Sequence, residues 1–131
     1  MIPWGIYAIF VGSSLLLIVL GLPMALGKIP PNNWYGFRTP VTMRSRAGWY
    51  AANIQYGWWT VLAGVLSLPF AIYGCFVSTG ASMIWVYVAV MLVPMGVGFA
   101  PSLIAARRAE MRAEEDSEEQ ERDELPDQFR R

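Results

Sequence analysis

The chain has 131 residues, of which 55% are hydrophobic and 15% charged, and its formal net charge is zero. That length predicts a single domain, and the hydrophobic content is typical of a membrane protein. With no His and only one cysteine, Cys75, the chain is expected to form no internal disulfide and no Cys/His metal cluster. No cofactor and no nucleic-acid partner are expected.

The charged residues divide the chain into two halves of opposite sign. Residues 1–106 carry one Lys, three Arg and no acid, which gives a net charge of +4. Residues 107–131 carry all ten acids and six Arg, which gives −4. This division predicts a membrane domain over 1–106 and a charged tail over 107–131.

The first apolar run, residues 3–26, contains no charged residue. At about 1.5 Å per residue it reaches about 36 Å, enough to cross a hydrocarbon core of about 30 Å. A cleaved signal peptide is the alternative, but the run is too long and no basic segment precedes it. It therefore predicts a first transmembrane helix, with Pro23 bending its exit.

A polar segment from Lys28 to Thr42 separates this run from the next. Its Pro-Pro and Asn-Asn pairs and its glycine predict a structured loop. Trp34, Tyr35 and Phe37 lie among polar residues here, as aromatic side chains do at the lipid headgroup level. Together with the residues up to 56, this segment is predicted to form an interfacial or cytoplasmic region, 27–56.

A second helical pattern follows, and Thr39-Pro40, Thr42 or Ser45 are all candidates for its start. Up to about residue 78 it would be about 51 Å long, more than a bilayer needs. We expect 45–56 to protrude or to lie along the interface and 57–77 to span.

Four residues of this second helix fall on one face: Trp49, Asn53, Gly57 and Thr60. Packing between helices and a face that recognises a partner both explain that spacing.

An uncharged turn over 76–82 leads to a third span over 83–105, and the tail is predicted to continue as a solvated helix to 124. Pro69 and Pro94 lie inside the second and third spans, which predicts either kinks or discontinuous helices that line a site. Because the tail carries −4 and the region before the second span +4, docking of the tail on that region is a further hypothesis.

The positive charges predict the orientation in the membrane. The 27–46 region carries +4, the 76–82 turn carries no charge, and three Arg follow the third span. Positive residues favour the cytoplasmic side, so we expect the N-terminus outside and the 27–46 region and C-terminus in the cytoplasm.

The apolar spans contain no Asp, Glu, His, Lys or Arg, which disfavours proton-coupled transport. Without His, a Ser or Cys nucleophile lacks its usual base, so an enzyme is not expected. The class of function that remains is recognition of a ligand or partner. Arg38, Arg44 and Arg46 suit phosphate or carboxylate groups, although generic attraction to anionic lipids is the alternative, and it is the favoured explanation for Lys28, Arg44 and Arg46. Arg38 could alternatively cap the C-terminal carbonyls of a helix.

A group of polar, aromatic and glycine residues in this region carries a resemblance to a known family. They are Asn32, Tyr35, Gly36, Arg38, Thr39, Pro40, Thr42, Ser45, Trp49, Asn53 and Gly57. The pattern resembles the signature of the SdpI (YfhL-like) family of bacterial multi-pass membrane proteins, over about residues 21–100. All of these residues except Ser45 are the candidate site.

The resemblance implies a non-catalytic protein of the bacterial inner membrane that confers immunity to a toxic peptide, or signals by holding a regulator at the membrane. The implied partners are a toxin peptide and a cytoplasmic regulator. Membrane lipids are expected partners of the basic residues, and a homo-oligomer is expected because three helices bury little among themselves. One alternative is an accessory subunit of a larger membrane complex, with Gly48/Ala52 and Gly96/Ala100 facing another chain. A second alternative is a small transporter with a polar cavity near Pro69 and Pro94.

Overall fold

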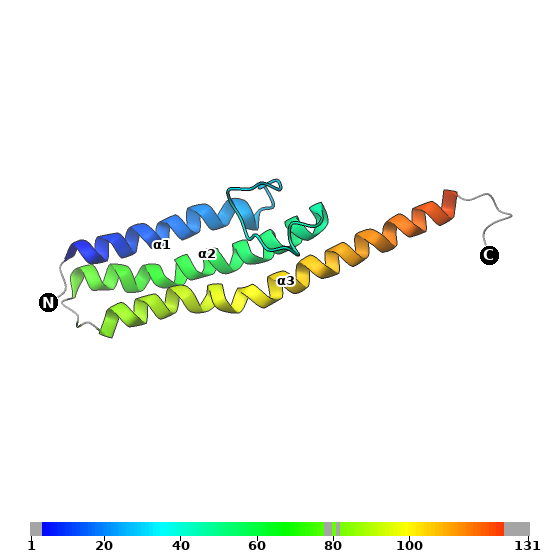
Figure 1. The fold of residues 1–131 in the computed structure, drawn as a ribbon. Coiled ribbons are helices and arrows are strands. Elements are labelled where there is room, and N and C mark those ends of the chain that lie inside the picture. Colours follow the sequence, from blue (N-terminus) through cyan, green and yellow to red (C-terminus); the bar gives the residue numbers. More distant parts are fainter. Residues whose placement is uncertain (1–3, 78–79, 81, 125–131) are drawn as a thin grey trace.

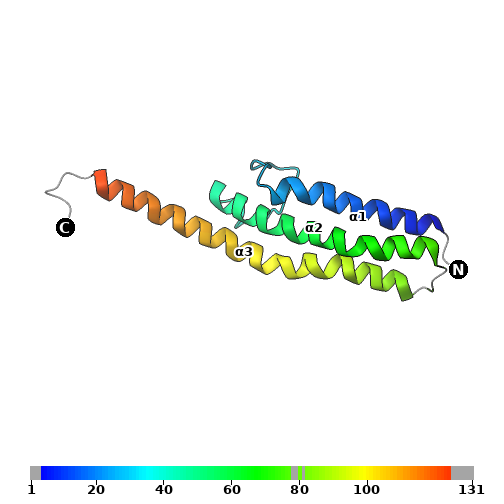
Figure 2. The same ribbon diagram turned by 180° about the vertical axis from the view of Figure 1, so that it is seen from behind.

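The computed structural model describes residues 4–77, 80 and 82–124. This part of the chain is helical apart from its connections and consists of α1 (Trp4–Ala25), α2 (Arg46–Phe76) and α3 (Ser82–Glu124). Each helix is long and apolar enough to cross a membrane. They lie side by side with α2 between the other two (Figures 1 and 2). The predicted all-α, three-span fold is confirmed. The expected first residue of span 1, parts of the 76–82 turn and the end of the tail lie outside the described residues.

Glycines bring the backbones of α1 and α2 into direct contact. A Cβ added at Gly57 would collide with the backbone of Ala25, and one at Gly64 would lie 2.7 Å from the carbonyl oxygen of Ser14. Nearer the other end of α2, Gly74 leaves room for the ring of Tyr7. Small residues allow this approach in membranes, where helix association depends on van der Waals packing rather than on the exclusion of water.

The packing of α3 against α2 follows the same principle. Gly98 of α3 makes room for the indole of Trp59, and Gly48 at the start of α2 lies against Ala106. Ala52, one turn further along, is fully buried. The Gly48/Ala52 face is therefore covered by α3 of the same chain, whereas an added Cβ at Gly96 would meet nothing within 4 Å.

A cluster of hydroxyl groups connects all three helices within the bundle. Ser14 Oγ lies 2.9 Å from Ser67 Oγ and 3.1 Å from Tyr87 Oη, and Ser13 Oγ lies 2.8 Å from Tyr87 Oη. Tyr87 also donates to the carbonyl of Phe10 and stacks on its ring. These polar groups satisfy one another in a region that is otherwise apolar.

The prolines inside α2 and α3 do not interrupt them. Both helices run continuously through Pro69, Pro94 and Pro101, so the discontinuous-helix alternative is wrong. Because α2 begins at Arg46 and packs against Ala106, residues 46–56 extend beside α3 as part of one continuous helix. The predicted region 27–56 thus consists of a loop and the first turns of α2.

Beyond Ala106, α3 continues as the predicted solvated helix. It projects past the other two helices, and residues 111–124 are exposed (Figure 1). The hypothesis that the acidic tail docks on the basic loop is therefore wrong for its described part. An uninterrupted helix directs these residues away from the loop, and each can hydrate its charge.

Candidate functional site

The connection between α1 and α2 folds over one end of the bundle, which we call the loop end. α1 finishes in a Schellman motif: Gly27 has φ 64°, its N–H donates to Met24, and that of Lys28 donates to Pro23. These bonds occupy the C-terminal carbonyls of α1. The motif turns the chain back toward α2.

Asn53 of α2 attaches the loop to the helix. Its Oδ1 accepts from the backbone N–H of Phe37 at 2.7 Å, and its Nδ2 donates to the carbonyls of Trp49 at 2.9 Å and Phe37 at 3.4 Å. Gly36, with φ 117°, passes so close that a side chain there would strike Asn53 and the Trp49 ring. Gly36, Trp49 and Asn53 therefore form one tightly packed unit.

Phe37 anchors the loop in the apolar bundle. Its ring stacks on Tyr56 of α2 with centroids 4.4 Å apart and meets Phe99 of α3 edge to face at 5.2 Å. It also packs in a buried cluster with Met24 and Ala106. The loop thus contacts all three helices through one side chain. The sequence predicts only a headgroup-level position for Phe37.

Asn32 shapes the tip of the loop. Its Oδ1 accepts from the N–H groups of Trp34 and Tyr35, and its Nδ2 donates to the carbonyl of Pro30. This turn presents Trp34 with 94% of its surface exposed. An ordered, exposed indole is typical of a membrane interface.

Thr39 and Thr42 stabilise the second half of the loop. Thr42 Oγ1 accepts from the Thr39 N–H at 2.8 Å and lies 3.0 Å from the carbonyl of Phe37, to which it donates. Pro40 lies in the intervening turn and is exposed. Of the three predicted helix starts, Ser45 is the N-cap, and its Oγ accepts from Gly48 N.

Arg38 is exposed, and its side chain makes one hydrogen bond within the described part of the chain. Its Nη1 donates to the carbonyl of Asn33 within the same loop. It does not cap a helix, because the end of α1 is closed by the Schellman motif.

The Tyr35 hydroxyl is buried and lacks a hydrogen-bond partner among the described residues. Its ring packs against the cluster that contains Phe37. Burial raises the pKa of Tyr35, because the phenolate would be desolvated. Tyr35 is thus the candidate residue with a buried polar atom that forms no hydrogen bond within the described residues.

The predicted stripe on α2 is one buried face that packs within the chain. Trp49 is fully buried, and its Nε1 donates to the carbonyl of Ile29 at 2.9 Å. Asn53 binds the loop, Gly57 meets α1, and Thr60 bonds back to its own helix. Gly57 therefore does not belong to the packed unit that Gly36, Trp49 and Asn53 form with the loop. These contacts favour the packing explanation.

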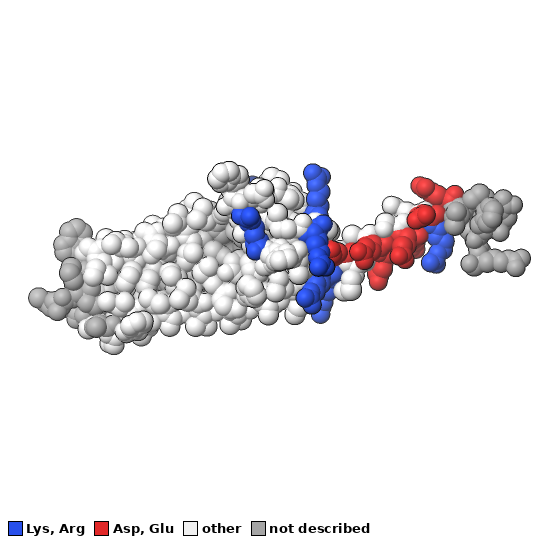
Figure 3. Space-filling model, viewed as in Figure 1, with Lys and Arg blue, Asp and Glu red and all other residues white. Residues whose placement is uncertain are grey.

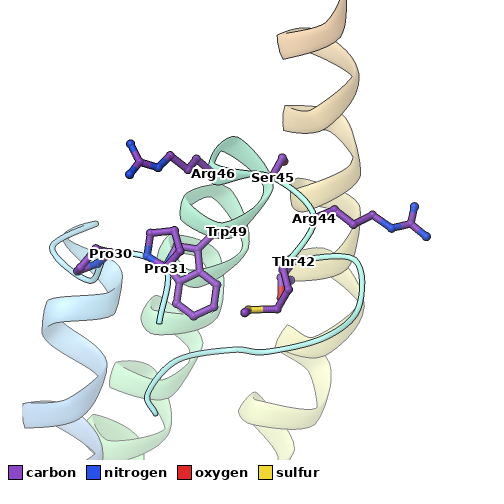
Figure 4. Close-up of a pocket in the computed structure, with 8 residues that line it drawn as sticks. Pro30, Pro31, Thr42, Arg44, Ser45, Arg46 and Trp49 are labelled. Carbon is purple, nitrogen blue, oxygen red and sulfur yellow. The ribbon is translucent and has the colours of Figure 1, made fainter. Parts of the chain in front are cut away.

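A cavity of about 260 Å³ opens between the loop and the first turn of α2 (Figure 4). It is lined by Pro30, Pro31, Thr42, Met43, Arg44, Ser45, Arg46 and Trp49. In Figure 4 the guanidinium groups of Arg44 and Arg46 lie on opposite sides and point outward. Two of these lining residues, Thr42 and Trp49, belong to the candidate site predicted from the sequence. The prolines were visible only as turn signals, because no periodic pattern links residues 30–31 to 42–49.

Comparison with protein families gives one match. The model of the SdpI/YfhL protein family matches residues 28–102, more than half of the chain. The chain belongs to the SdpI/YfhL protein family. Neither the curated proteins nor the solved structures yield a match.

The SdpI/YfhL match begins in the loop and ends inside α3. It therefore covers the loop from residue 28, all of α2 and the part of α3 up to residue 102. It leaves out α1 and the exposed extension of α3. The residues that carried the resemblance lie within the matched range, and most of them build the loop end. With three membrane-length helices, this family member is a membrane protein.

Proposed function

We propose that this SdpI-family chain is a non-catalytic binding protein of the bacterial inner membrane, which confers immunity to a toxic peptide, signals by holding a regulator, or does both. The immunity and signalling roles come from the family resemblance. The observation that carries binding is the loop end, where candidate residues build an ordered platform. This platform is stabilised by hydrogen bonds from the loop backbone to the side chains of Asn32, Asn53 and Thr42.

The orientation belongs to the same proposal. The cations before Met111 lie at the loop end, and the described link between α2 and α3 carries no charge. The positive-inside bias then puts the platform and the α3 extension in the cytoplasm. A regulator would reach the platform from that side, and a membrane-inserted peptide would meet the apolar helix faces.

The transporter alternative predicted a polar cavity near Pro69 and Pro94. The hollows beside these prolines have volumes of about 350 and 300 Å³. Apolar side chains and Tyr73 line them, including Phe70 and Val93. Such hollows suit hydrocarbon rather than a polar solute, so the structure gives this alternative no support.

The test is purification in a mild detergent followed by mass spectrometry of whatever accompanies the chain. Wild type is compared with Arg38→Ala and with Arg108→Ala, which removes the same charge from α3. Thermal stability is measured in parallel. We expect a peptide or regulator to accompany wild type and Arg108→Ala and to be lost from a stably folded Arg38→Ala.

Stoichiometric membrane subunits in all three samples would contradict the proposal. They would favour an accessory subunit that uses the open Gly96/Ala100 face.

A further inference from the structure

Seven cations form a collar around the loop end. They are Lys28, Arg38, Arg44, Arg46, Arg107, Arg108 and Arg112, and all are exposed. Figure 3 shows Lys and Arg gathered between the uncharged bundle and the acidic extension of α3. Within the described residues none of the seven is in a salt bridge. Their charge is therefore available to an anion from outside the chain.

The collar lies where the headgroup layer of a bilayer would be. The charge-free parts of all three helices end at it, and a hydrocarbon core accepts no unpaired charge. The exposed Trp34 is held at the same end of the molecule by the Asn32 turn. Indole and cationic side chains are both favoured at that depth. The anion most concentrated there is lipid phosphate.

The cavity beside the collar has walls suited to such a group. Pro30, Pro31 and Trp49 form apolar parts of its wall, and no carboxylate lines it. The Trp49 N–H is already used by the carbonyl of Ile29, and the cationic groups among the lining residues are the guanidiniums of Arg44 and Arg46. Although both point outward, exposed side chains change rotamer in picoseconds to nanoseconds. They can therefore turn toward a bound anion.

The size of the cavity is also suitable. Its 260 Å³ corresponds to roughly nine water molecules at about 30 Å³ each, room for a phosphate with a small polar substituent. A guanidinium donates two parallel hydrogen bonds to phosphate oxygens. An arginine on either side would hold such a group from two directions.

We propose that this cavity binds the phosphate headgroup of an anionic phospholipid of the surrounding bilayer, held by Arg44 and Arg46. The other residues of the collar attract anionic lipids without forming a defined binding site. The inference is independent of immunity or signalling, because it requires only the loop end and a membrane.

The experiment counts the lipids that remain on the full chain after purification in mild detergent from bilayers of phosphatidylglycerol and phosphatidylcholine. The cavity variant Arg44→Gln/Arg46→Gln is compared with Arg107→Gln/Arg108→Gln, which removes the same charge from the collar on α3. We expect wild type and the α3 variant to retain about one phosphatidylglycerol per chain. The cavity variant should lose at least about tenfold, since it removes the charge-assisted hydrogen bonds to the phosphate, which the α3 arginines do not make.

A second variant, Met43→Trp, fills the cavity without changing charge. Met43 is 43% exposed, so the larger side chain can be accommodated. We expect it to lose the retained lipid as well, which decides the question if the double variant fails to fold. Equal losses from the two arginine pairs, or retention of phosphatidylcholine, would overturn the proposal. So would displacement of the lipid by millimolar inorganic phosphate, which would identify free phosphate as the ligand.

Discussion

Asn53 shows how a single side chain determines the shape of the loop end. It satisfies both backbone groups of Phe37, a residue that belongs to no helix or strand and is buried all the same. A buried backbone N–H without a partner is costly in free energy, and a loop has no ladder to supply one. The amide of Asn53 offers an acceptor and a donor in one group, which no apolar residue of similar size can do.

We therefore expect Asn53→Ala to lower the free energy of unfolding by about 1–3 kcal/mol, because the Phe37 N–H loses its acceptor. Thermal unfolding in detergent measures this change. Asn33→Ala is the matched control, since Asn33 is exposed and bonds Arg38 through its backbone. A smaller loss in Asn53→Ala than in the control would show that the loop is held by Phe37 packing alone.

Tyr35 provides the opposite case, a hydroxyl that the fold does not use. Tyr35→Phe should leave stability unchanged or raise it by about 1 kcal/mol, because it removes a buried unpaired group. Burial raises the pKa of Tyr35, so the folded state holds the proton more tightly than the unfolded state. The corresponding stability is present below pH of about 10 and is lost as pH rises further.

Unfolding curves of wild type and Tyr35→Phe between pH 8 and 12 test this expectation, with the variant losing less stability above pH of about 10. Parallel curves for the two proteins would mean that the hydroxyl is hydrated. A marked loss of stability in Tyr35→Phe at neutral pH would mean that it has a partner.

At the scale of the elements, α2 is the helix around which the others pack. Its Gly57 and Gly64 face α1, and its Gly48 and Trp59 face α3. Contact between α1 and α3 passes through Tyr87, which reaches the carbonyl of Phe10. Because apolar helices gain nothing by leaving lipid, close backbone approach and a few hydrogen bonds must specify how they pack.

Gly57→Ala should therefore be strongly destabilising, by about 1–3 kcal/mol or more, since its methyl group would collide with the backbone of Ala25 and force the helices apart. Gly96→Ala is the control, because its methyl group meets nothing within 4 Å. Thermal unfolding and the yield of monodisperse protein report the difference. Equal effects of the two substitutions would contradict the close crossing of α1 and α2.

For the whole molecule, charge is segregated along the bundle axis: an uncharged region, then the basic collar, then the acidic extension of α3 (Figure 3). The extension gains no tertiary packing, as residues 111–124 are exposed. Such a segment contributes to solubility and to encounters with charged molecules rather than to the stability of the bundle.

Deleting residues 113–131 should accordingly change the free energy of unfolding by less than about 0.5 kcal/mol, as surface changes usually do. Proteolysis of the full-length extension should be equally fast at low and high salt and in Arg44→Gln/Arg46→Gln, because residues 111–124 are exposed rather than docked on the loop. Unfolding curves and the rate of limited proteolysis are the measurements. Protection that salt abolishes would restore docking of the tail on the loop.

The sequence by itself determined the three membrane-length helices, the position of the loop and the separation of charge. A hydrocarbon core requires long apolar helices and excludes charge, so composition and length predict these features without knowledge of any tertiary contact. The family signature was equally readable, because it is a local pattern of residue types within residues 28–102.

Only the tertiary structure decided what the signature residues do. An Asn or Thr can pair with many partners, and the amide of Asn53 acquires its role when Phe37 is brought across 16 positions of the chain. Ser45 became the N-cap among three candidate positions, all of which carry Ser or Thr, residue types that cap helices. The cavity exists because the Schellman turn returns residues 30–31 to the start of α2, and such long-range contacts leave no periodic trace in the sequence.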